Sequence, residues 1–378
     1  MSTIYIHWGY CLSKCYYCNF NSVPCNKALD YEAWCNAYIK VLREYRRRYY
    51  RNEKITSIYF GGGTPSLLPG WFVAKILDEI SAHFKLSETV EITLEANPKT
   101  INKSKAHSFK SAGINRLSIG VQSIIDSDLK MLGRIHSAAD AISCVMDMTQ
   151  IFDNVSIDIM YNRPGQNLAS WENELRTVLH YPIQHISLYE LIVEPNTKIK
   201  AMIEAERLPP PSSSSKFFEK TIEIARSNGF ERYEVSNFAK NEHYGRHNIS
   251  YWKYDDYYGI GAGAHSRCSI EGRKIAIAQI EDNEEWLKWA SADITFCEEK
   301  LTEEDEFKER LLMGLRSKFG IKLKDISNHI KTKYGLNAKL DKLRANSYII
   351  SMGDDMILTD EGIMKLNLII RYLTEECL

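Results

Sequence analysis

Short apolar runs alternate with longer amphipathic stretches over the first half of the chain. Each short run is rich in β-branched and aromatic residues, which predicts a buried strand. Each longer stretch carries apolar residues at three- and four-residue spacing, which predicts a helix. We expect strands over 3–7, 55–60, 90–94, 116–121, 155–161 and 185–191, and helices over 30–51, 71–84, 103–112, 138–151 and 168–180.

Six strands joined by helices predict a parallel sheet and an α/β fold, because parallel neighbours need a crossover connection. Right-handed crossovers place the helices outside the sheet. Six such units can form either a doubly wound sheet or a partial barrel. In both, residues that bind ligands are expected at the carboxyl ends of the strands.

The second half of the chain changes character. We expect a surface loop over 208–215, a helix over 214–229 and a strand over 233–235. Acidic, polar sequence takes over near 285–300, which predicts one domain over 1–285 and another over 286–378. The second domain shows three helical patterns, two short strands around a turn and a final helix, which is typical of a winged-helix-like module. It lacks a basic recognition helix, so we expect a structural or partner-docking role.

The composition is that of an ordinary globular protein. The chain has 378 residues, of which 44% are hydrophobic and 26% charged, and its formal net charge is −1. No overall field would attract nucleic acid, so none is expected as a partner. Nine cysteines without a recognisable secretory leader indicate a reducing compartment, and we expect a cytoplasmic protein. No apolar run is long enough to span a bilayer.

Three cysteines follow the first predicted strand at CxxxCxxC spacing: Cys11, Cys15 and Cys18. Three thiolates suit a [4Fe–4S] cluster, whose fourth iron then stays open for a small molecule. A structural zinc site would take four ligands, usually as two pairs, and no second CxxC exists. Three core cysteines on one helix face are the structural alternative. The neighbouring Gly9 and Asn19 favour a loop.

A glycine run, Gly61-Gly62-Gly63, directly follows the second predicted strand. Without a Cβ, this backbone can approach a ligand closely. It is neither a phosphate loop nor a dinucleotide fingerprint, because Gly-Lys-Ser/Thr and GxGxxG are both absent. Taken alone, a plain turn is an equally good interpretation.

Polar residues close the later strands. Glu95 and Gln122 end the third and fourth strands, Arg134 follows Gln122 by twelve residues, and Asp158 lies within the fifth strand. A carboxylate at a strand end could accept from a ribose hydroxyl or an ammonium group, although Glu95 also fits a simple strand-end turn. A buried Asp is costly unless it is paired or liganded. Pairing between Asp158 and Arg134 is the structural alternative.

A third group of residues joins a histidine to aromatic side chains. His247-Asn248 is followed by Tyr251-Trp252. An imidazole can bind heme iron, and aromatic rings can stack on the macrocycle. A lone histidine is more often part of a hydrogen-bonded structure, and His7 and His265 are alternative ligands.

Together these motifs resemble the radical S-adenosylmethionine (radical SAM) superfamily. The resemblance rests on CxxxCxxC and on Gly61-Gly62-Gly63-Thr64-Pro65. Within the superfamily, Tyr5-Ile6-His7 and His-Asn-x-x-Tyr-Trp from His247 resemble the group of oxygen-independent coproporphyrinogen oxidases and HemW-type heme chaperones. The oxidases carry another cysteine at the position of Phe20. HemW-type proteins resemble this chain in having phenylalanine there.

The resemblance implies an open (βα)6 barrel, a cluster and a cofactor. The three cysteines would hold the [4Fe–4S] cluster, and heme would bind near His247. Client hemoproteins, among them respiratory membrane proteins, would receive the heme, so peripheral membrane contact is allowed, and porphyrinogen oxidation is not expected. The alternative is an oxygen-independent coproporphyrinogen III oxidase. S-adenosyl-L-methionine would be bound by Tyr5, Tyr17, Gly62, Gly63, Thr64, Glu95, Gln122, Arg134 and Asp158.

The chain departs from the family pattern at three places. Gly9 stands where the family has proline, Gly245 where it has cysteine, and Asn162-Arg163 where it has Gly-Leu. A glycine-rich block over 259–266 matches the family, and we expect it to close over the cofactor.

Overall fold

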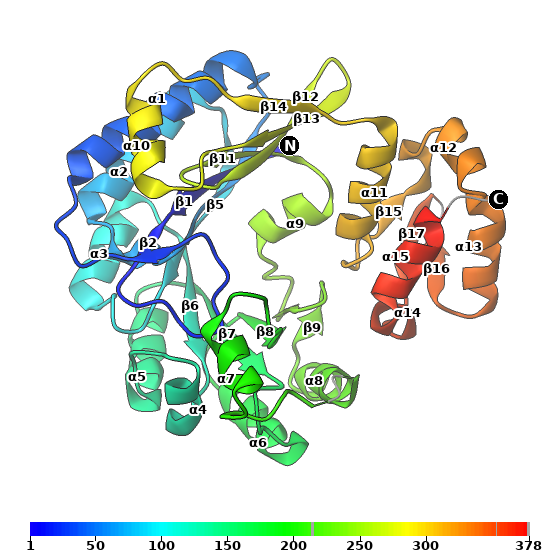
Figure 1. Cartoon of the computed structure of the whole chain (residues 1–378), viewed down its shortest axis with the longest axis horizontal. Helices are drawn as coiled ribbons and strands as arrows, with labels where there is room; N and C mark the ends of the chain where they lie inside the picture. Colours follow the sequence, from blue (N-terminus) through cyan, green and yellow to red (C-terminus); the bar gives the residue numbers. More distant parts are fainter. Residues whose placement is uncertain (213–214, 353, 376–378) are drawn as a thin grey trace.

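A twelve-stranded sheet organises the chain from residue 2 to residue 300 (Figure 1). It is seen in a computed structural model that describes residues 1–212, 215–352 and 354–375. Six strands pair in parallel as β1-β4-β5-β6-β7-β8, which confirms the predicted α/β fold with an open (βα)6 arrangement. They are β1 (Ser2–Trp8), β4 (Ile55–Gly62), β5 (Leu86–Ala96), β6 (Arg116–Gln122), β7 (Asn154–Tyr161) and β8 (His185–Glu190).

The helices that connect these strands bury one apolar face and begin at polar caps. The Asp30 side chain accepts from the Ala33 N–H at 3.0 Å at the start of α1. Ser137 and Asp140 form a reciprocal capping box at the start of α5. The crossover helices are α1 (Tyr31–Arg48), α2 (Gly70–His83), α3 (Lys103–Ala112), α5 (Ala138–Thr149) and α6 (Leu168–Val178). Shorter elements that the periodicity did not predict are η1 (Pro65–Leu67), α4 (Asp126–Met131), α7 (Lys198–Glu204) and α9 (Arg246–Trp252), whereas α8 (Ser215–Ser227) was predicted.

Additional strands extend the sheet beyond both edges of the parallel core. On one side β11 lies parallel to β1, and β12, β13 and β14 continue antiparallel. The predicted strand over 233–235 is wrong, because the Glu234 carboxylate accepts from the Ser236 N–H and turns the chain between β9 and β10. The added strands are β9 (Glu231–Arg232), β10 (Asn237–Ala239), β11 (Asp256–Ile260), β12 (His265–Ile270), β13 (Arg273–Ala278) and β14 (Cys297–Lys300).

A second, smaller hydrophobic core lies in the C-terminal part of the chain. The elements of this part are coloured orange to red in Figure 1 and lie beside the large sheet. Before it, α10 (Asn283–Ser291) packs on α1, with Trp286 stacked on Trp34 at 5.6 Å between ring centroids. These elements and β14 therefore lie with the large sheet, beyond the expected boundary at 285, and we propose a division near residue 301 instead. The C-terminal elements are α11 (Glu303–Gly314), β15 (Ile321–Lys322), η2 (Leu323–Asp325), α12 (Asn328–Lys333), α13 (Leu336–Ala345), β16 (Ile349–Met352), β17 (Asp355–Leu358), α14 (Asp360–Met364) and α15 (Leu366–Thr374).

From residue 303 the chain forms three helices, the β16–β17 hairpin and two final helices. The prediction did not include β15, which lies between the first two helices and pairs with β17. The assignment of this part as a winged-helix-like module stays a prediction. The turn residue Gly353, and residues 213–214 of the predicted loop and helix start, lie outside the described residues.

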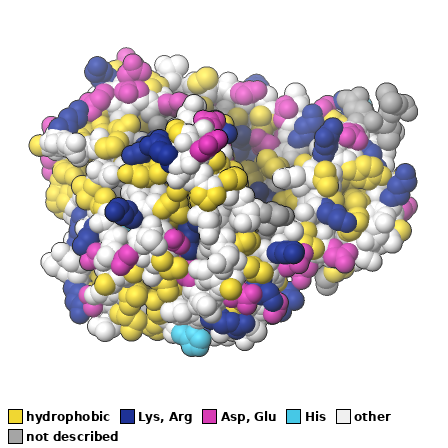
Figure 2. Space-filling model, turned by 60° about the horizontal axis from the view of Figure 1, so that its bottom comes forward, with side chains coloured by type: hydrophobic (Ala, Val, Ile, Leu, Met, Phe, Trp, Pro, Cys, Tyr) yellow, Lys and Arg dark blue, Asp and Glu magenta, His cyan; other side chains and the backbone are white. Residues whose placement is uncertain are grey.

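The surface charge and the length of the helices bear on whether the protein binds nucleic acid or crosses a membrane. On the face drawn in Figure 2, basic and acidic side chains are interspersed, without a large area of one sign. Within residues 1–212, 215–352 and 354–375, no helix is long and apolar enough to cross a bilayer.

Candidate functional site

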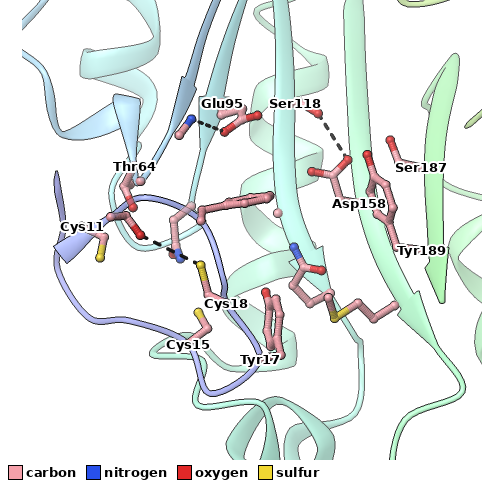
Figure 3. Close-up of a pocket in the computed structure, with 18 of the residues that line it drawn as sticks. Cys11, Cys15, Tyr17, Cys18, Thr64, Glu95, Ser118, Asp158, Ser187 and Tyr189 are labelled. Atoms are coloured by element: carbon pink, nitrogen blue, oxygen red, sulfur yellow. Dashed lines mark hydrogen bonds between the residues drawn. The ribbon is translucent and has the colours of Figure 1, made fainter. Parts of the chain in front are cut away.

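The parallel strands enclose one cavity of about 540 Å³ (Figure 3). Because parallel neighbours end at the same edge of a sheet, residues far apart in the sequence meet there. Every residue assigned to the cluster or the cofactor lines this cavity, and so does His247, whereas the alternative heme ligands His7 and His265 do not. The roles of the lining residues as ligands stay predictions. The predicted residues that line the cavity are Tyr5, Cys11, Cys15, Tyr17, Cys18, Gly62, Gly63, Thr64, Glu95, Gln122, Arg134, Asp158 and His247.

Hydrogen bonds hold the cysteine loop in place, both at its base and within the loop. Short strands β2 (Tyr10–Cys11) and β3 (Val23–Pro24) pair in parallel and close the loop. The Lys14 ammonium donates to the Phe20 carbonyl at 3.1 Å and to the Ser22 carbonyl at 2.9 Å. The three thiols therefore face the cavity from an ordered loop, as Figure 3 shows.

The thiol donors fit an iron–sulfur cluster. Burial, and then the neighbouring Cys18 and Cys15, raises the pKa of the Cys11 thiol to about 11, so its thiolate needs a cation to stabilise it. Cys25 lines a different cavity, where its thiol lies 3.5 Å from the Lys27 carbonyl oxygen, and Cys35 is buried in α1; neither lines the cavity of the three thiols. Across the described part of the chain, no three His, Cys, Asp or Glu side chains converge on one metal ion. That result concerns a single ion, whereas a cluster places its thiolates on separate irons.

The glycine turn at the end of β4 is required by packing. Gly62 has φ +109°, a conformation that side chains rarely adopt. The Gly63 N–H donates to the Trp8 carbonyl at 2.7 Å, and a Cβ on Gly63 would lie 2.5 Å from the Tyr10 carbonyl oxygen. The sequence interpretation considered only the approach of a ligand. In the structure the glycines also allow the turn to pack against the chain that leads into the cysteine loop.

Two partly buried carboxylates face the middle of the cavity. Glu95 accepts from the Tyr59 hydroxyl at 2.8 Å and from the Gly62 N–H at 3.2 Å, and burial raises its pKa to about 7. Asp158 accepts from the Ser118 hydroxyl at 3.3 Å, and burial raises its pKa to about 6. A cationic ligand would favour the ionised form of both carboxylates.

Arg134 joins the cysteine loop to β6 and is not the partner of Asp158. Its guanidinium donates to the Cys15 sulfur at 3.2 Å and to the Gly120 carbonyl at 2.5 Å, and its Nε is buried without a partner. No ion pair joins Arg134 to Asp158 in the described structure, so the structural alternative for these two residues is wrong. Gln122 sits at a bulge of β6 with φ +70°.

His247 lies on α9 at the far end of the cavity and is already engaged. Its Nδ1 is 3.0 Å from the Ser57 hydroxyl, and its Nε2 is 2.9 Å from the Tyr251 hydroxyl. Burial lowers its pKa to about 3, so the imidazole is neutral. An iron bond to either nitrogen would have to replace one of these hydrogen bonds. Asn248 and Tyr251 also line the cavity, whereas Trp252 lies under the Arg316 guanidinium at 5.2 Å.

The glycine-rich block does not close over the cavity, which corrects that expectation. It forms β11 and the following turn, and a Cβ on Gly261 would lie 2.2 Å from the His7 carbonyl oxygen. The block therefore lies beside β1, as its neighbour in the sheet. His265 is exposed at the start of β12 and does not line the cavity, so it is not a candidate ligand there.

Several cavity residues were missed by the sequence analysis. Arg116 and Ser118 share a face of β6 with the predicted Gln122 through the two-residue period of a strand, and that period was the signal that could have found them. The missed residues on β8 share no strand with a predicted residue, so no such signal marked them. Ser118 and Arg116 lie two and four residues before Gly120, and Figure 3 shows Ser187 and Tyr189 beside Asp158. Among the missed residues are Tyr59, Arg116, Ser118, His185, Ser187 and Tyr189.

Comparison with known proteins identifies the family. Residues 5–178 match the Radical SAM superfamily. The chain is 34% identical to the heme chaperone HemW of Buchnera aphidicola, over 72% of this chain and 72% of that protein. It is 32% identical to HemW of Synechocystis sp., over 84% of this chain and 78% of that protein. The chain belongs to the HemW family of radical SAM proteins.

Two further relatives show how widely this family and its fold extend. The HemW-family chain is 32% identical to a Danio rerio protein named "Radical S-adenosyl methionine domain-containing protein 1, mitochondrial", over 98% of this chain and 86% of that protein. The crystal structure of coproporphyrinogen III oxidase (HemN) from Escherichia coli superposes with a TM-score of 0.81 at 17% identity, covering 99% of this chain and 90% of that chain. At that identity the likeness shows the fold alone.

Proposed function

We propose that this HemW-family protein binds a [4Fe–4S] cluster, S-adenosyl-L-methionine and heme, and delivers heme to client hemoproteins. The observation that carries the proposal is the gathering of all the predicted ligand residues around one cavity in a chain of this family. We further propose a cytoplasmic location. We also propose that the protein contacts the membrane surface peripherally when it delivers heme to respiratory clients.

The thiols and the polar strand ends take separate roles in this proposal. Cys11, Cys15 and Cys18 hold the cluster, which supplies one-electron chemistry to the sulfonium cofactor when both are bound. Asp158 and Glu95, partly buried in the cavity, balance the positive charge of the cofactor. The other predicted cofactor contacts are Tyr5, Tyr17, Gly62, Gly63, Thr64, Gln122 and Arg134.

Heme is assigned to the same cavity, with His247 as its proposed iron ligand. Imidazole coordination requires the ring to give up Ser57 or Tyr251 as a partner. The apolar Phe20, 61% exposed, stands at the cavity where the related oxidases carry a further cysteine. An exposed phenyl ring offers apolar contact to a flat macrocycle rather than a ligand to a metal.

The experiment that tests this proposal separates a chaperone from an oxidase. The protein is reconstituted anaerobically with iron and sulfide and titrated with hemin, and a parallel sample receives S-adenosyl-L-methionine, a reductant and coproporphyrinogen III. We expect stoichiometric hemin binding and no protoporphyrinogen. Sustained decarboxylation would contradict the proposal and favour an oxygen-independent coproporphyrinogen III oxidase, whose fold the chain shares.

A further inference from the structure

The cavity runs the length of the parallel strands, and its two ends differ in chemistry. On β6, Arg116, Ser118, Gly120 and Gln122 alternate along one face, and all four line the cavity. Six residue steps at about 3.3 Å separate the first residue of this strand from the last by roughly 20 Å. Gln122 lies at the end that holds the thiols, and Arg116 lies at the opposite end.

Arg116 is a buried cation whose N–H groups make few hydrogen bonds. Its side chain is only 4% exposed, yet its nearest carboxylate, that of Glu91, is 4.0 Å from Nε. One weak hydrogen bond reaches the Thr93 hydroxyl at 3.5 Å, and Nε has no partner. Buried guanidinium groups ordinarily make several bonds of 2.7–2.9 Å, often two to one carboxylate. Arg116 therefore has donors to offer to a group that enters the cavity.

The groups around Arg116 do not satisfy it. His185 begins β8 and bonds through its two nitrogens to Ser156 at 2.7 Å and to Tyr233 at 2.7 Å, and burial lowers its pKa far below the usual value. His247 is likewise neutral. Among the described residues that line the cavity, the cations are Lys14, Arg134 and Arg116, and the first two lie at the cysteine loop.

We propose that Arg116 binds a propionate carboxylate of a tetrapyrrole that enters the cavity, a site distinct from that of the sulfonium cofactor. The planar guanidinium fork matches a carboxylate, and a net negative partner would complete the bonds that Glu91 leaves unmade. The cofactor carries a carboxylate too, but the proposed function places that carboxylate at the open iron beside the thiols, at the Gln122 end of β6, whereas Arg116 begins the strand. The inference rests on that function, because it takes the tetrapyrrole from it.

The test uses protoporphyrin IX, which has both propionates but no iron, so that His247 cannot contribute as an iron ligand. Binding is followed by porphyrin fluorescence in the full-length reconstituted protein, for wild type, Arg116→Gln and Arg116→Lys. Arg267→Gln is the matched control, because Arg267 is a partly buried arginine paired with Glu309 away from the cavity. The dimethyl ester of protoporphyrin IX and S-adenosyl-L-methionine are titrated alongside.

Arg116→Gln should weaken protoporphyrin IX binding about ten- to a hundredfold, the range expected for hydrogen bonds to a charged group. Arg116→Lys should recover part of the affinity, because it restores the charge without the fork. The ester should bind wild type and Arg116→Gln equally weakly, and the affinities for S-adenosyl-L-methionine should not change. The wild-type comparison of acid with ester measures the carboxylate contribution even if a variant fails to fold.

Three results would overturn the inference, and a fourth would refute the proposed function. Unchanged protoporphyrin IX binding by Arg116→Gln would remove Arg116 as the anchor. Equal losses for acid and ester would show a structural role only. A loss confined to S-adenosyl-L-methionine would assign the carboxylate to the cofactor. Wild type that binds neither protoporphyrin IX nor hemin would instead refute the proposed function, on which the inference depends.

Discussion

Arg163 should be a stabilising residue even though it departs from the motif pattern that the family resemblance implies at this position. Its side chain is fully buried and pairs with Glu174, which is 1% exposed, and with Asp128 at 2.8 Å. It also donates to the Met160 carbonyl at 2.9 Å and to the Gln122 carbonyl at 3.3 Å. The guanidinium therefore joins the ends of β6 and β7 to α4 and α6.

Replacing Arg163 by leucine would leave the Glu174 carboxylate buried without its cation. The Glu174 carboxylate would still accept hydrogen bonds from the Ser123 hydroxyl at 2.6 Å and from the Ile124 N–H at 2.9 Å. These two bonds compensate only in part for the loss of the cation. Breaking a buried pair by removing one partner costs about 3–5 kcal/mol. We expect the free energy of unfolding, from urea denaturation followed by circular dichroism, to fall by about that amount.

Two further variants make the result decisive. Arg163→Leu combined with Glu174→Gln removes the stranded charge but keeps an acceptor for Ser123, so it should lie within about 2 kcal/mol of wild type. Arg226→Leu removes an exposed pair with Asp360, and should cost about 1 kcal/mol or less. If Arg163→Leu were no less stable than Arg226→Leu, the buried network would not stabilise the fold.

Three shorter predictions concern the cavity. Alanine at Cys15 should abolish most of the cluster absorbance after anaerobic reconstitution, whereas alanine at Cys25 should not; the reverse would refute the ligand assignment. Burial raises the pKa of Glu95 from 4.5 to about 7, so the folded state keeps a proton that the unfolded chain releases in that window. The urea midpoint of the ligand-free protein should therefore fall as pH rises from about 4.5 to 7, and Glu95→Gln should flatten this dependence. His247→Ala should weaken hemin binding and shift its Soret band, and Tyr251→Phe should strengthen binding by freeing Nε2; an unchanged titration of the alanine variant would exclude His247 as a ligand.

The parallel core could be predicted from sequence because its strands are buried on both faces. Continuous β-branched and aromatic runs mark such strands, and the rule that ligands lie at their carboxyl ends led to Glu95 and Gln122. The same rule directed attention away from Arg116 and His185, which begin their strands. Arg116 and His185 line the cavity because the cavity extends along the barrel to the beginning of these strands. No local sequence pattern indicates how far a cavity extends.

The elements that were missed depend on long-range pairing. Residues 259–263 suggest a glycine loop for a ligand, but their burial comes from β1, more than 250 residues earlier. The acidic sequence near residue 285 reflects the solvent-facing side of α10, whereas Trp286 on its other side packs against α1. Composition averages over the two faces of a helix, so it does not reveal that Trp286 packs against α1.

The measurement that tests the central claim most directly is heme transfer. The reconstituted protein is loaded with hemin, freed of excess and mixed anaerobically with the apo form of a b-type hemoprotein, while the absorbance spectrum is recorded. If the chain is a heme chaperone, the spectrum of the acceptor's holo form should appear as that of the donor declines, faster than from free hemin. Heme that stays on the donor, together with protoporphyrinogen formed from coproporphyrinogen III, would contradict the account.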